Sequence, residues 1–133
     1  MYTTFKIEDI NIKTISIIIF TILFTGCTLK HPSKSISSTI LIKTPNMKYH
    51  DKGFIYYYED YIKLQLLNIG QVVLNLKIYQ DKICKGTFEC MSSKEFNEKY
   101  FHSSYNNDFL FNLFKQNTIY FKDKKNNILI KVK

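Results

Sequence analysis

The chain has no arginine, so all 19 of its basic side chains are lysine. Proteins that read a nucleic-acid sequence rely on the arginine guanidinium group, which makes paired hydrogen bonds to a base or a phosphate. We therefore expect no nucleic acid among the partners of this protein. The formal net charge of +8 suits non-specific attraction to anionic lipid or sugar surfaces, but an AT-rich genome also enriches a chain in lysine.

Glycine and histidine are scarce as well. Four glycines are too few and too scattered for a loop that binds phosphate through its backbone amides. His31, His50 and His102 have no nucleophile or metal ligand at a recognisable spacing, and the carboxylates are scattered. The sequence therefore predicts a protein that is not an enzyme and that binds neither a metal nor a diffusible cofactor.

The most informative segment is an apolar run near the N-terminus, from Ile15 to Phe24. It is shorter than the roughly 20 residues that a membrane-spanning helix needs, and Lys6 and Lys13 precede it, as in a secretory signal peptide. The run leads into a motif that resembles the lipobox of bacterial lipoproteins: Leu23, Phe24, Thr25, Gly26 and Cys27. An uncleaved anchor and a buried core helix are the alternative interpretations.

The lipobox resemblance implies cleavage before Cys27 and an N-acyl diacylglyceryl lipid on that cysteine. Residues 1–26 would be the signal peptide, and 107 of the 133 residues would remain. Residues 27–39 would be the lipidated cysteine and a serine-rich flexible tether, and residues 40–133 a single β-rich domain. The implied location is the bacterial cell envelope, with the lipid in the outer membrane and the domain facing the periplasm.

Alternating apolar and polar residues predict antiparallel strands on both sides of a turn at residues 68–71. The apolar face of the first strand includes Leu64 and Leu66, and that of the next includes Val72, Leu74 and Leu76. The remaining strands are expected at residues 40–42, 54–58, 83–84, 118–121 and 128–132.

Helix signals appear only after these central strands. Ser92 and Glu95 have the spacing of a capping box, so we expect a helix from there to about Phe101. A second helix is expected from about Asn107, because Phe109, Leu110, Leu113 and Phe114 fall on one helical face. The predicted fold class is therefore α+β, with an antiparallel sheet that has one wet face and with two short helices packed on one face.

Cys84 and Cys90 form an even pair in a chain that is predicted to be exported, where disulfides persist. Their spacing suits a structural disulfide across a hairpin or a strand-to-helix corner, which would add about 2–3 kcal/mol of stability. It is wider than the usual spacing of zinc ligands and of redox cysteines. Free thiols and a metal or redox site remain the alternatives.

Ile69 is the least expected residue in the strand pattern. It occupies a hairpin tip between Asn68 and Gly70, where Asn-Gly or Asp-Gly is the usual pair. An exposed β-branched residue at a tip does nothing for folding, whereas a loop that touches a membrane or a cargo needs one. Single exposed apolar residues are also common, so an incidental surface position is the alternative.

Two segments resemble LolB-like outer-membrane lipoproteins. Residues 61–76 resemble the central hairpin of that family, and residues 107–114 the short helix that follows it. The whole chain also resembles small lipoproteins of Campylobacter and Helicobacter relatives. The LolB resemblance implies an open half-barrel with helices over a hydrophobic cavity. The side chains expected to line that cavity are Leu64, Leu66, Val72, Leu74 and Leu76.

The same resemblance implies a non-catalytic function. The protein would bind or place lipoproteins or another lipid cargo at the outer membrane, and Ile69 would touch the bilayer. Its partners would be the membrane itself, through the lipid anchor, and lipoprotein acyl chains or a periplasmic carrier protein. The alternative is a structural or accessory lipoprotein of a cell-envelope complex.

Overall fold

The computed structural model describes residues 11–22 and 29–133. They belong to two units, residues 1–30 and 31–133, and each is described by itself. In the first unit, much of the apolar run lies in helix α1 (Ile12–Ile22), where the Phe20 side chain is 63% exposed. Among the described residues, no helix has the length and apolar character needed to cross a membrane.

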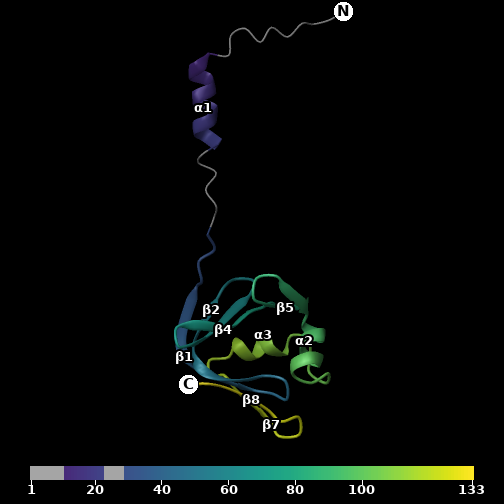
Figure 1. Cartoon of the computed structure of the whole chain (residues 1–133). Helices are drawn as coiled ribbons and strands as arrows, with labels where there is room; N and C mark the ends of the chain where they lie inside the picture. The colour runs from purple at the N-terminus through teal and green to yellow at the C-terminus, as the bar shows by residue number, and fades with distance from the viewer. Residues whose placement is uncertain (1–10, 23–28) are drawn as a thin grey trace, which may run out of the picture. The chain divides into compact units, whose positions relative to one another are not determined.

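The second unit is built on one open antiparallel sheet (Figure 1). Its strand order is β6-β5-β4-β3-β2-β1-β8-β7. Six consecutive strands form a meander, and the C-terminal hairpin then adds to the free edge of β1. The predicted α+β class is confirmed. The strands are β1 (Lys34–Lys43), β2 (Lys48–Tyr57), β3 (Ile62–Asn68), β4 (Gln71–Ile78), β5 (Lys82–Lys85), β6 (Glu89–Ser92), β7 (Tyr120–Asp123) and β8 (Ile128–Val132).

The flexible tether predicted for residues 27–39 is too long. Strand β1 already begins at Lys34, which pairs with Tyr57 of β2, and the Ser33 amide donates to the Tyr57 carbonyl at 2.8 Å. The domain thus starts near residue 31 rather than at residue 40. The serine-rich sequence concealed the strand because only alternate side chains face the core. Of these, Ile36 is partly buried and Ile40 fully buried.

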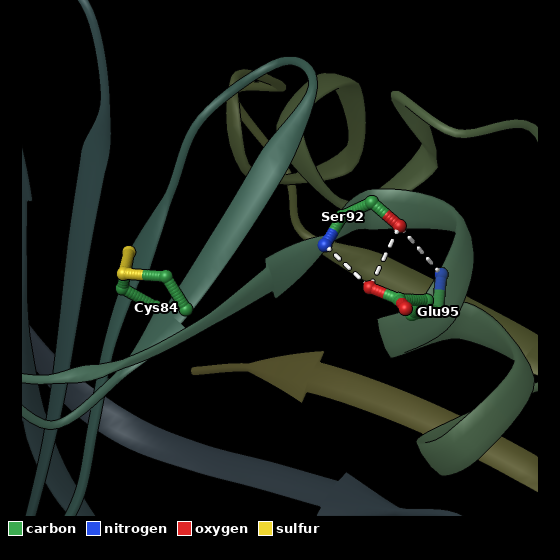
Figure 2. Close-up of a disulfide and its surroundings, with 4 residues drawn as sticks. Cys84, Ser92 and Glu95 are labelled. Atoms are coloured by element: carbon green, nitrogen blue, oxygen red, sulfur yellow. Dashed lines mark hydrogen bonds between the residues drawn. A yellow bond between two sulfur atoms is a disulfide. The ribbon is translucent and has the colours of Figure 1, made fainter.

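Two short helices cover one face of the sheet. The predicted capping box begins α2 (Ser93–Tyr100): the Ser92 hydroxyl accepts from the Glu95 amide, and the Glu95 carboxylate accepts from the Ser92 amide (Figure 2). The second helix, α3 (Phe109–Phe114), contributes Leu110, Phe111, Leu113 and Phe114 to the core.

Contacts at both ends place α3 across the sheet. Near its start, the Phe109 ring lies 4.8 Å from that of Phe121 in β7. Near its end, the Tyr57 hydroxyl of β2 donates to the Phe114 carbonyl at 2.9 Å, and burial raises the pKa of Tyr57. Since the core cluster takes all its residues from 36–132, the domain of residues 31–133 has a complete hydrophobic core of its own.

Candidate functional site

The Ile69 hairpin is the most unusual feature of the domain. Asn68 pairs with Gln71, so Ile69 and Gly70 are the two loop residues, and both have positive φ, at 48° and 75°. Such a loop favours Asn-Gly, because a β-branched side chain at positive φ is strained by about 1–2 kcal/mol. The Ile69 side chain is 98% exposed. The prediction of an exposed apolar tip is confirmed, and the strain is an additional cost that sequence reasoning did not identify.

Further apolar side chains lie at the same edge of the sheet as Ile69. Both the β3–β4 and β5–β6 turns are at this edge, because the strands alternate in direction. Phe88, in the β5–β6 turn, is 95% exposed, and Val73 is also exposed. We call this the tip edge: Ile69, Val72, Val73 and Phe88. Phe88 was missed in the sequence, because nothing local distinguishes it from a core aromatic residue.

Val72 lies on the opposite face from the one predicted. The register shifts between Leu66 and Leu67: Leu66 pairs with Leu74, but Leu67 pairs with Val72. This β-bulge inserts one extra residue and turns Val72 away from the core, so that it is 52% exposed. Strict alternation carries no signal of a bulge, which is why the sequence placed Val72 with Leu74 and Leu76.

The other four residues predicted to line a cavity belong instead to the packed core. Leu64 and Leu66 are fully buried and Leu74 and Leu76 are each 2% exposed, in the same cluster as Phe96 and Phe114 of the helices. These side chains leave almost no surface that water can touch, so they face packed neighbours rather than open space. An acyl chain would have to displace α2 or α3 to reach them. The predicted cavity is therefore corrected to a solid core.

Cys84 and Cys90 form a disulfide, as favoured from their spacing (Figure 2). They are directly opposite each other in β5 and β6. The bridge ties together the two strands of the hairpin that carries Phe88. This hairpin lies at the edge of the sheet, directly beside the Ile69 hairpin. Within the described residues, no group of three His, Cys, Asp or Glu side chains comes close enough to hold a metal ion.

The predicted lipidation site lies outside the described residues, which omit 23–28 and with them Cys27 and its lipobox. The edge of the domain at which β1 begins also holds the turns at residues 58–61 and 79–81. We call it the far edge, because it lies about 23 Å along the strands from Ile69.

A hydrogen-bonded pair ties the β7–β8 hairpin to the segment before α3. The Tyr105 hydroxyl makes a short hydrogen bond to Oδ2 of Asp123, and the Asn126 side chain donates to the same oxygen at 2.7 Å. Burial, then the bond to Asp123, raises the pKa of Tyr105 to about 12. The bonds from Tyr105 and Asn126 lower the pKa of Asp123 to about 2. Both side chains take part in hydrogen bonds that hold the hairpin in place, so we assign them no catalytic or binding role.

A scan of protein-family models found no match to this chain, and searches of curated proteins and of solved structures found none either.

Proposed function

We propose that this protein is a lipid-anchored, non-catalytic lipoprotein of the bacterial cell envelope that helps to place lipoproteins or another lipid cargo in the outer membrane. The lipid on Cys27 would hold the domain at the membrane facing the periplasm. The observation that supports the cargo role is Ile69, an apolar side chain that is 98% exposed in a strained turn. Burial of such a side chain in lipid returns about 1.5–3 kcal/mol.

The contact with cargo is proposed at the tip edge and not inside the sheet. The LolB-like half-barrel implied by the sequence would carry an acyl chain in its concave face. In this chain Leu64 and Leu66 of that face are fully buried against other side chains. The tip edge, in contrast, presents Ile69, Val72, Val73 and Phe88 to the surroundings. It would disturb the lipid surface or shield an acyl chain briefly during insertion.

An Ile69→Glu substitution in the lipidated chain tests this proposal. The measurement is the rate at which a purified lipoprotein enters vesicles that carry the protein. We expect a loss of about tenfold or more, because a carboxylate strongly disfavours entry into lipid. Asn117→Glu is the matched control, since Asn117 is an exposed neutral residue between α3 and β7. Equal transfer by Ile69→Glu and wild type, with both folded, would exclude the cargo role for Ile69.

The second candidate is a structural or accessory lipoprotein of an envelope complex, and the solid core favours it. A photo-crosslinking amino acid at position 69 separates the two candidates in living cells. Adducts with lipid or with lipoprotein acyl chains support cargo placement. A single protein adduct of constant mass, with no lipid adduct, supports the accessory role instead.

A further inference from the structure

The outer face of the sheet, opposite the helices, is populated by lysine, and the outward-facing positions of the described strands hold no carboxylate. Alternation along each strand places eight lysines at outward positions: Lys43, Lys48, Lys52, Lys63, Lys77, Lys82, Lys122 and Lys131. The carboxylates within strands, Asp51, Glu89 and Asp123, occupy the opposite alternation. The net charge of +8 is therefore not spread evenly but concentrated on this face.

Two cross-strand pairs show that this arrangement disfavours folding. Lys43 is directly opposite Lys48, and Lys63 is directly opposite Lys77. Like charges at facing positions of an antiparallel pair destabilise a sheet, whereas opposite charges there stabilise it. Aromatic rings accompany the lysines: Lys63 Nζ lies 5.8 Å from the centre of the Tyr56 ring, and Lys131 Nζ 5.9 Å from that of Tyr120. A face of this kind is complementary to an anionic surface.

The outer face is also hollowed beside Ile69. A shallow hollow of about 680 Å³ is lined by hydroxyls of β1, by His50 and Lys52 of β2, and by the apolar side chains Phe54, Leu67 and Ile69. A second hollow of about 210 Å³ shares Thr39 and His50 with the first and adds Lys131 and Lys133. The carboxylate in the first hollow is that of Asp51, whose Oδ1 accepts from the Asn68 side chain at 2.7 Å.

We infer that the outer face of the sheet docks on an anionic phospholipid bilayer, with a lipid phosphate in the paired hollows between Lys52 and Lys131. Hydroxyl and ammonium donors suit a phosphate, and the apolar side chains at the Ile69 end suit the first methylenes of an acyl chain. The domain then lies flat: the tip edge touches lipid, the far edge lies about 23 Å away along the strands, and the lysines lie between them. The helices face away from the membrane.

Vesicle binding by the soluble domain, residues 31–133, tests this inference without the lipid anchor. We expect binding to vesicles of phosphatidylcholine with about 30% phosphatidylglycerol at about 50 mM salt, and release at about 300 mM. A Lys52→Glu/Lys131→Glu variant should bind at least about tenfold more weakly. Lys94→Glu/Lys115→Glu makes the same change of charge at exposed residues on the helical side and should bind nearly as wild type.

Several outcomes would overturn the inference. One is an equal loss of vesicle binding in the two double-lysine variants. Another is equal binding of the domain to anionic vesicles and to pure phosphatidylcholine vesicles. The third is binding to an anionic polysaccharide with none to vesicles. A second measurement needs no variant: spin-labelled lipid should broaden the amide signals of Thr39, His50 and Lys131 and leave those of α2 sharp. The inference does not depend on cargo placement, because loss of transfer in Ile69→Glu with intact vesicle binding separates the two.

Discussion

The β3–β4 and β7–β8 turns meet the same backbone requirement with different residues. Each contains one residue other than glycine at positive φ, Ile69 at 48° and Asn127 at 54°. Asparagine tolerates that conformation, and the β7–β8 turn is further held by Asp123, which accepts from the amide and the side chain of Asn126. Isoleucine is strongly disfavoured in that conformation, and because Ile69 is exposed, no burial of its side chain offsets the strain. The β7–β8 turn is therefore suited to folding, and the β3–β4 turn retains a residue that folding disfavours.

The β5–β6 turn extends the comparison, since its hairpin is held by a disulfide. Replacing Cys84 and Cys90 together by serine should lower the free energy of unfolding by about 2–3 kcal/mol, the largest effect expected at any of the three turns. Urea unfolding of oxidised wild type and of the double variant measures this difference. Loss of less than about 0.5 kcal/mol would mean that the short strands β5 and β6 hold the turn without the bridge.

Exchanging the residues at the two turns tests the comparison directly. Asn127→Ile should lower the free energy of unfolding by about 1–2 kcal/mol, because isoleucine is strained at positive φ. Ile69→Asn should raise it by about 1 kcal/mol, while lipoprotein transfer falls. Thermal unfolding and the transfer assay on the same preparations provide the two readings. If Ile69→Asn destabilises the domain, Ile69 has a folding role that the contacts do not reveal.

The smallest effect is the pH dependence that Asp123 contributes to the β7–β8 turn. Its pKa is lowered from 3.8 to about 2 in the folded protein. The stabilisation is therefore fully present above about pH 4 and is lost as the pH falls through about 2. Asp123→Asn removes this contribution, so its unfolding temperature should change less than that of wild type between pH 4 and pH 2. Parallel curves for the two proteins would show that Asp123 does not stabilise the turn.

Sequence patterns predicted local structure well, but they predicted poorly which side chains face the core. The Ser92–Glu95 capping box, the turn at Ile69 and the Cys84–Cys90 bridge all follow from side-chain chemistry over a few residues. Signals of this kind are readable because the groups that interact are close in the chain. The position of Val72 was wrong because a bulge changes which side chain faces the core without changing the pattern of apolar residues.

The sequence by itself determined the two strands on either side of the Ile69 turn, the two short helices, the cysteine pair and the apolar character of the tip. Only the tertiary structure decided that residues 34–39 join the sheet instead of forming a tether, because that depends on pairing with β2. It also decided that the face of Leu64 and Leu66 is packed solid and that eight lysines share the other face. Burial and charge on a face arise from strands far apart in the chain, and no local pattern contains that information.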